Sequence, residues 1–344
     1  MTTDVSQPEV ARLHGETVIV EGHRDCYEQI HLRNQGHDDP IGERLLPRLR
    51  AGGVDVVVYA VGGDSIAHSN GRDKPLLATL ENIAGIADVI LRSEGAASFA
   101  LSGSDLPEQP DGTIRFVLHL EGGRPLEGSL GALEALFRLG VRSIQPAWNL
   151  RNELADGVRE GATGGGLTRF GVDVVREMER LGMLIDLAHM SEAGFWHTLR
   201  TTTGPIGISH ANATAVHDHP RNVTDEQIVA IAERGGVVGV HAVPVFVDET
   251  RPTVDRLVDH VEHMVTIAGV EHVALGCDFI RNDGPRSGRE QIPKRTVEEL
   301  EGFGEIDELP TLTAALLRRG FTATEVAAIL GGNSVRLLRQ VLPG

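Results

Sequence analysis

Short runs of β-branched and aliphatic residues recur along the chain and alternate with longer stretches of helical periodicity. Eight of these runs have the length and composition of parallel strands buried on both faces. They cover residues 17–23, 54–61, 114–120, 141–147, 184–188, 205–209, 236–241 and 272–277. The segments between them carry apolar residues at helical spacing, as from Leu76 to Arg92. This alternation predicts an α/β fold, and eight strands favour a single (β/α)8 TIM-type barrel over an open doubly wound sheet.

The length of 344 residues suits one large barrel with additions at its ends. We expect one domain over residues 1–344, with an N-terminal extension at 1–15 and extra closing helices at 307–344. Residues 281–306 contain Gly, Pro and charged residues and predict a long loop near the barrel mouth. Such loops often carry function, although a plain surface insertion explains this composition equally well.

Composition narrows the range of partners. The formal net charge of −17 argues against a nucleic-acid partner, because nucleic-acid binding requires a clustered basic surface. No run approaches the ~18 apolar residues of a transmembrane helix, and residues 1–15 lack the apolar core of a signal peptide. We therefore expect a cytoplasmic protein without a membrane partner. The two cysteines, Cys26 and Cys277, are expected to be free thiols.

Candidate metal ligands stand where the predicted strands end. His23 and Asp25 are two residues apart, so on an extended strand both side chains point to one side. Glu121 follows an apolar strand and precedes two glycines, while His189 and His210 end two consecutive strands. For each residue alone, a capping carboxylate or a hydrogen-bonded core histidine is the simpler interpretation. Together, at the end of the barrel where active sites lie, they predict a metal site with two ions.

Further charged residues accompany these candidates. Asp278 closes the eighth strand and can accept a proton from a metal-activated water, although a capping role is the alternative. His119 lies two residues before Glu121 and is a rival ligand that we favour as a supporting residue. Asp186 is expected to orient a ligand histidine, or else to be a buried structural carboxylate.

Several motifs resemble, in order along the chain, those of the membrane (renal) dipeptidase family, zinc peptidases of the amidohydrolase-like barrel class. The matching stretches are Gly22-His23-Arg24-Asp25, Glu121-Gly122-Gly123, the segment from Gly182 to Ser191, Ser209-His210-Ala211-Asn212-Ala213, the segment from His219 to Glu226, Gly276-Cys277-Asp278-Phe279 and Gly331-Gly332-Asn333. The resemblance implies that His23 and Asp25 hold one zinc ion, that His189 and His210 hold a second, and that Glu121 bridges them. It also implies that Arg221 meets the substrate and that the protein forms a homodimer.

The chain departs from the family pattern around the substrate. Trp148 stands where many members have a histidine that contacts the substrate, and an indole N–H donates only one hydrogen bond. After the seventh strand, His241-Ala242-Val243 replaces an Asn-Phe-Tyr-like segment, and Ile280 replaces a usual Asp. The predicted ligand set is complete, whereas the predicted substrate contacts are altered.

These observations lead to one main hypothesis. We expect two Zn²⁺ ions per chain, roughly 3.5–4 Å apart, whose shared hydroxide cleaves the amide bond of a dipeptide or a similar small N-acyl amino acid. Asp278 and Glu121 are the predicted catalytic residues, and Arg221, Trp148 and His241 the predicted substrate-binding residues. Manganese or iron suits the same donors. The altered substrate contacts leave open a lactam, a lactone or a modified dipeptide as substrate, and a non-catalytic binding protein is the remaining alternative.

Overall fold

The computed structural model describes residues 5–69, 71–279 and 299–344. The strands are β1 (Ile19–Asp25), β2 (Val54–Gly63), β3 (Ala97–Phe99), β4 (Ile114–Glu121), β5 (Val141–Gln145), β6 (Leu184–Ile185), β7 (Val238–Val240) and β8 (Val273–Leu275). The helices are α1 (Gln7–Glu16), α2 (Tyr27–Asn34), α3 (Leu46–Ala51), α4 (Pro75–Arg92), α5 (Leu130–Arg138), α6 (Arg169–Leu181), α7 (Glu192–Thr201), α8 (Asp225–Glu233), α9 (Pro244–Val247), α10 (Val254–Ala268), α11 (Leu309–Arg318), α12 (Ala323–Ala327) and α13 (Asn333–Val341).

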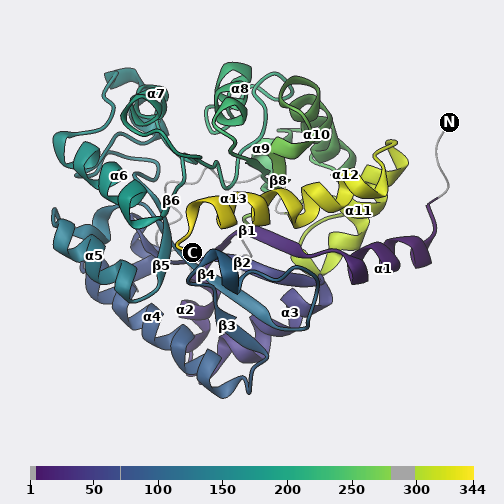
Figure 1. Ribbon diagram of the computed structural model, residues 1–344, viewed down its shortest axis with the longest axis horizontal. Helices are drawn as coiled ribbons and strands as arrows, with labels where there is room; N and C mark the ends of the chain where they lie inside the picture. The colour runs from purple at the N-terminus through teal and green to yellow at the C-terminus, as the bar shows by residue number, and fades with distance from the viewer. Residues whose placement is uncertain (1–4, 70, 280–298) are drawn as a thin grey trace.

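The strands form a parallel barrel with the helices arranged around it (Figure 1). Backbone pairing follows the order β1-β2-β4-β5-β6 and resumes at β7-β8. Two isolated parallel bridges, Asp186 with Gly207 and Ile208 with Val238, connect these two sheets. The (β/α)8 prediction is therefore confirmed, and the strand interiors are buried on both faces, as in the fully buried β2.

The junction between β8 and β1 lacks a backbone ladder within the described residues. A side chain bridges it instead, because the Glu21 carboxylate accepts a hydrogen bond from the Cys277 N–H at 2.9 Å. Close approach of the two strands requires Gly22, since a Cβ atom at this position would lie 2.2 Å from the carbonyl oxygen of Leu275. Cys26 and Cys277 are both buried free thiols.

Some predicted elements differ from the observed ones. Residues 205–209 were predicted as a strand but contribute only single bridges on each side, because their pairing partners are too short to extend a ladder. The three-residue strand β3 was not predicted, and it pairs with β4 outside the barrel path. Part of the expected N-terminal extension is helix α1, which buries Val10 and Leu13.

The expected long loop at 281–306 lies mostly outside the described residues. In its final part, residues 299–306, two apolar side chains pack into the core, since Leu300 is 2% and Phe303 0% exposed, while Glu299 and Glu301 are exposed. After it, α11, α12 and α13 fill the C-terminal stretch. None of the helices in the described part of the chain has the length and hydropathy needed to cross a bilayer.

Helix boundaries follow from capping residues. The predicted capping box at the start of α8 is present: the Thr224 hydroxyl accepts from the Gln227 N–H, and the Gln227 side chain accepts from the Thr224 N–H. Helix α6 is preceded by the cap residue Thr168 and followed by Gly182, whose φ of 74° lies in the left-handed region that favours glycine.

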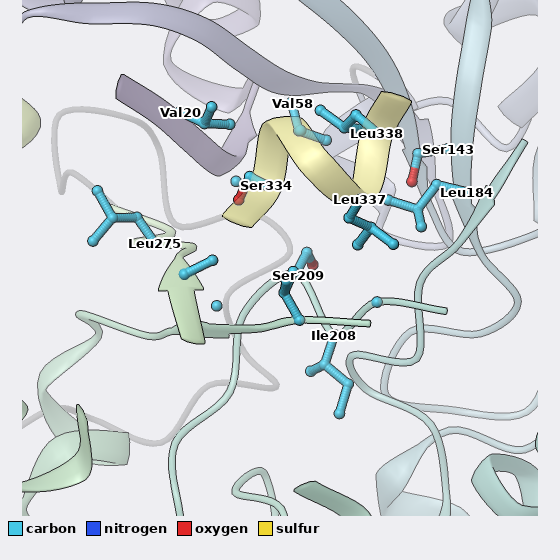
Figure 2. A pocket seen from close by; sticks show the side chains of 15 residues that line it. Val20, Val58, Ser143, Leu184, Ile208, Ser209, Leu275, Ser334, Leu337 and Leu338 are labelled. Carbon is cyan, nitrogen blue, oxygen red and sulfur yellow. The ribbon is translucent and has the colours of Figure 1, made fainter. Parts of the chain in front are cut away.

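Helix α13 closes the amino-terminal end of the barrel. It lies across the strands at the centre of the molecule (Figure 1). Leu337 and Leu338 of α13 face Val20, Val58 and Leu184 of the barrel interior across a small cavity (Figure 2). The cavity volume is about 30 Å³, room for about two water molecules. Among the described residues, this cavity is therefore too small for a substrate-sized ligand.

Candidate metal centre

The carboxyl ends of the strands bring the predicted ligands together at the opposite end of the barrel. His23 and Asp25 end β1 and Glu121 ends β4, while His189 and His210 follow β6 and the segment bridged to β7. All five side chains are at most 9% exposed. The parallel arrangement causes this convergence, because every strand of a parallel barrel ends at the same face.

The donor atoms of these residues are spaced like ligands of shared cations. The Nε2 atom of His23 lies 3.6 Å from Asp25 Oδ1 and 3.6 Å from Glu121 Oε1. The same Glu121 oxygen lies 3.2 Å from His189 Nε2 and 3.8 Å from His210 Nε2. Around one tetrahedral zinc ion with bonds of about 2.0–2.1 Å, neighbouring donor atoms are about 3.3–3.4 Å apart, so these four distances lie within about 0.5 Å of that spacing. Glu121 thus lies between the β1 pair and the two later histidines, where a bridging carboxylate would be.

Several of these buried atoms lack a hydrogen-bond partner within the described residues. They include both ring nitrogens of His23, Asp25 Oδ1 and Asp278 Oδ1. Buried polar atoms without partners are costly, at about 1–3 kcal/mol each, and a metal ion would satisfy them. Imidazole and carboxylate are also the donors that zinc takes in hydrolases. The residues present therefore fit divalent cations.

Electrostatics divides the centre into two halves. Burial alone would lower the pKa of His23, but the carboxylates of Asp25, Glu121 and Asp278 outweigh it and raise this pKa to about 10. Burial raises the pKa of Glu121 well above its usual value, and the Asp25 charge raises it further. On the other side, burial keeps the pKa values of His189 and His210 well below the ordinary value. The half that contains Asp25 and Glu121 therefore attracts positive charge, and the half that contains His189 and His210 presents neutral imidazoles.

Neighbouring residues orient the two neutral histidines. The Nδ1 atom of His189 lies 2.9 Å from Asn149 Oδ1, an acceptor, so Nδ1 carries the proton and Nε2 presents a lone pair. Asp186 accepts backbone N–H bonds from Ala188 at 3.0 Å and Ser209 at 2.8 Å, and so fixes the chain directly before both histidines. Asp186 therefore acts on the backbone next to the histidines rather than on their rings.

His119 is placed differently from the ligand candidates. Its Nδ1 atom lies 3.0 Å from the Ser143 hydroxyl and its Nε2 atom 3.2 Å from Gln145 Oε1. Both nitrogens therefore have partners on β5, and burial lowers the pKa of His119 to about 4. The geometry agrees with a supporting position beside Glu121.

Asp278 and His241 form a buried pair beside the ligands. The Nε2 atom of His241 donates to Asp278 Oδ2 at 2.8 Å, while Asp278 Oδ1 lies 4.0 Å from His23 Nε2. Asp278 has a φ of 52°, and His189 one of 64°, so two residues of the centre adopt a left-handed backbone that is rare outside glycine. His241, expected to contact substrate, is thus engaged with Asp278, and only its Nδ1 atom is unpartnered in the described chain.

Arg221 and Trp148 border the same centre. Arg221 is 5% exposed; it donates from Nη2 to the His210 carbonyl at 3.0 Å, and its buried Nε has no partner among the described residues. Burial lowers the pKa of Arg221 to about 10, which still leaves it charged at neutral pH. The Trp148 ring is half-buried, with its centroid 5.8 Å from that of His189.

Three residues at the centre were not predicted. The Asp64 carboxylate, just after β2, accepts N–H bonds from Arg124 and Trp148 at 2.9 and 3.0 Å and so joins two loops. Tyr27, two residues after Asp25, donates from its hydroxyl to Glu121 Oε2 at 3.3 Å. His68 lies near Asp25, with 3.3 Å between His68 Nε2 and Asp25 Oδ1. Tyr27 continues the spacing of His23 and Asp25, whereas the positions of Asp64 and His68 follow no short-range pattern.

Two proteins are similar in sequence to most of this chain. A protein of Klebsiella pneumoniae described as "Uncharacterized protein in pqqA 5'region" is 33% identical over 273 residues, which cover 76% of this chain and 95% of that protein. Dipeptidase verJ of Clonostachys rogersoniana is 31% identical over 298 residues, which cover 85% of this chain and 73% of that protein.

Solved structures share the fold. A metallo peptidase from Rhodobacter sphaeroides, solved with a phosphinate mimic of the dipeptide L-Ala-D-Ala, superposes with a TM-score of 0.81 at 24% identity and covers 95% of this chain and 99% of its own. The family model described as membrane dipeptidase (peptidase family M19) matches residues 7–342. The chain therefore belongs to the membrane dipeptidase family, peptidase family M19, whose members are metal-dependent dipeptidases.

Proposed function

We propose that this protein hydrolyses the amide bond of dipeptides or similar small N-acyl amino acids at a centre of two zinc ions. The ligands would be His23, Asp25, Glu121, His189 and His210, with Glu121 shared by both ions. The observation that carries the proposal is the spacing of their buried donor atoms, which lie 2.9–3.8 Å apart around Glu121.

Bound zinc ions would supply a Lewis acid for the carbonyl oxygen and a water of lowered pKa. Asp278 would accept the proton of that water at Oδ1 and deliver it to the leaving amine. Its other oxygen, Oδ2, is held by His241 at 2.8 Å, so the carboxylate is fixed with Oδ1 directed toward His23. Because the carboxylate is already held in place, less conformational entropy is lost when the reactive geometry forms.

Arg221 would bind the carboxylate of the substrate. Its buried, charged guanidinium has an unpartnered Nε–H in the described chain, and planar guanidinium groups bind carboxylates with paired hydrogen bonds. A substrate whose free carboxylate meets Arg221 would place its amide carbonyl over the centre. This supports short substrates with a free C-terminus.

The test is turnover of a panel of L,L- and L,D-dipeptides by zinc-loaded protein. The L,D series is included because the Rhodobacter sphaeroides peptidase was solved with an L-Ala-D-Ala mimic. Release of free amino acids that requires metal is the expected result. If the protein binds two zinc ions but hydrolyses no dipeptide of the panel, the proposed dipeptide hydrolysis is wrong, whereas the proposed metal centre is not contradicted.

One observation favours a second candidate, a metal-dependent hydrolase of a lactam, a lactone or a modified dipeptide. Trp148 places an indole within 5.8 Å of the His189 ring, a bulky apolar wall beside a predicted ligand. An indole favours a flat or apolar substituent over a small polar side chain. Cyclic amides and esters with aromatic substituents should therefore be screened beside the dipeptides, and turnover of these alone would favour the second candidate.

A further inference from the structure

His68 is a buried histidine that the proposed ligand set does not include. It lies in a 3₁₀ turn, η2 (Ile66–Ser69), a few residues after the end of β2. The residue is 1% exposed, and neither of its ring nitrogens has a hydrogen-bond partner within the described residues. Burying an imidazole whose two nitrogens have no hydrogen bond costs free energy, and binding of a cation to one nitrogen would offset this cost.

The fold holds His68 in this position. Its backbone N–H donates to the Ser65 carbonyl at 3.1 Å. Its carbonyl accepts from Asn82 Nδ2 of α4 at 3.1 Å, and the same amide donates to the Val61 carbonyl of β2 at 2.9 Å. The Tyr27 ring packs against the imidazole with 4.6 Å between centroids. Because backbone and ring are both anchored, the unpaired nitrogens are not the result of a freely rotating side chain.

The Nε2 atom of His68 points to the half of the centre that contains Asp25. It lies 3.3 Å from Asp25 Oδ1, yet neither atom has a hydrogen bond to any described residue, so the two are close without being aligned as donor and acceptor. Donor atoms of Asp25, His68 and Glu121 all lie within 4.8 Å of one another. A separation of 3.3 Å equals the distance of about 3.3–3.4 Å expected between two ligands of a tetrahedral zinc ion with bonds of about 2.0–2.1 Å.

We propose that His68 Nε2 is a further protein ligand of the cation held by Asp25 and Glu121, so that the segment after β2 contributes to the metal centre as well. This inference rests on the proposed metal centre and adds a residue to it. A nitrogen ligand on this carboxylate-rich side favours zinc over magnesium or calcium, which prefer oxygen donors. Metal binding would also fix the turn η2 against β1.

The competing role for His68 is that of a hydrogen-bond donor that orients the Asp25 carboxylate without touching the metal. The two roles differ in one bond, because only a ligand has its nitrogen bonded directly to the ion. A measurement that detects this bond separates them, whereas loss of activity does not.

The experiment uses full-length protein labelled with nitrogen-15 at histidine and loaded with cadmium-113, a zinc substitute with a nuclear spin. Scalar coupling between cadmium and a ring nitrogen is expected for His23, His68, His189 and His210. The variant His68→Gln should lose only the His68 coupling. A matched control, His31→Gln on α2 outside the centre, should retain all couplings.

Coupling at His23, His189 and His210 without coupling at His68 would overturn this inference and leave the proposed metal centre intact. Absence of coupling at every histidine would overturn the metal centre and this inference together. The wild-type spectrum alone decides, so a variant that fails to fold does not prevent the test. In competition with a chelator for zinc, His68→Gln should lower the affinity of the protein for one of its two zinc ions by at least ~10-fold. Unchanged affinity for both ions would contradict the proposal.

Discussion

Replacement of Asp278 by asparagine tests the predicted proton transfer with little change in structure. Asparagine tolerates the left-handed backbone that Asp278 adopts at φ 52°. Its amide oxygen can accept the bond that His241 Nε2 now donates at 2.8 Å. The substitution therefore removes the proton-accepting carboxylate and retains the backbone, the side-chain volume and the contact with His241.

The expected loss follows from the role assigned to Asp278. A positioned general acid or base contributes about 10²- to 10⁴-fold to the rate, equal to about 3–5 kcal/mol on the barrier. For Asp278→Asn we therefore expect kcat to fall about 100- to 10,000-fold, with a small change in KM. The assay is steady-state dipeptide hydrolysis by zinc-loaded protein, with the metal content of each sample measured by elemental analysis.

A matched control is available at the other end of the barrel. Asp55 is also a buried carboxylate, 6% exposed, and accepts the Ile19 N–H at the start of β1. Asp55→Asn should alter stability but not kcat. If Asp278→Asn binds two zinc ions and retains kcat within tenfold of the wild type, the proposed role of Asp278 is wrong.

Three further predictions concern substrate, metal and pH. Arg221→Lys should lower kcat/KM for dipeptides about 10- to 100-fold, because charge-assisted hydrogen bonds contribute about 1.5–3 kcal/mol. The loss in kcat/KM should be smaller for dipeptides with a C-terminal amide, and an equal loss for both kinds of substrate would contradict carboxylate binding by Arg221. Removal of metal with a chelator should abolish activity and lower the Tm, and zinc at about 100 times its Kd should add about 3 kcal/mol to the free energy of unfolding; a Tm independent of zinc would be inconsistent with a metal-filled centre. His260 accepts the Ala213 N–H at Nδ1 and donates from Nε2 to the Val247 carbonyl, and burial lowers its pKa to about 4. Because this folded-state pKa lies below the unfolded value of 6.5, its contribution is present above that value and is lost as the pH falls toward 4. Between about pH 7 and about pH 5, the free energy of unfolding of metal-free protein in urea should therefore decrease by about 2 kcal/mol more for the wild type than for His260→Gln, and parallel pH curves for the two proteins would show that His260 does not titrate this way.

Sequence periodicity predicted the barrel and the face that carries the centre, because both depend on local order. On any extended strand, residues i and i+2 such as His23 and Asp25 point to the same side, and β1 includes both residues. Glu121, His189 and His210 were predicted as ligands because each stands at the end of a predicted strand, and the structure places all three side chains near one another. The family resemblance, confirmed by the comparisons, added the pairing of these residues that spacing alone leaves open.

Contacts between distant loops were beyond the reach of sequence patterns. The backbone N–H of Trp148 is held by Asp64, 84 residues earlier, and nothing near either residue indicates this contact. The prediction of His241 as a substrate contact did not include its bond to Asp278, which forms because β7 and β8 are neighbours and the residues that follow them meet. Likewise, the position of His68 depends on how the η2 turn folds back, which the Asn82 amide controls from α4.

Closure of the barrel base by α13 has a consequence for how the chain reaches its final form. This helix comes after every barrel strand in the sequence, so during synthesis on the ribosome the apolar base formed around Val20, Val58 and Leu184 stays uncovered until residues 333–341 have emerged. Nascent chains halted before that point should bind chaperones that capture exposed apolar surface, and release should coincide with the docking of Leu337 and Leu338.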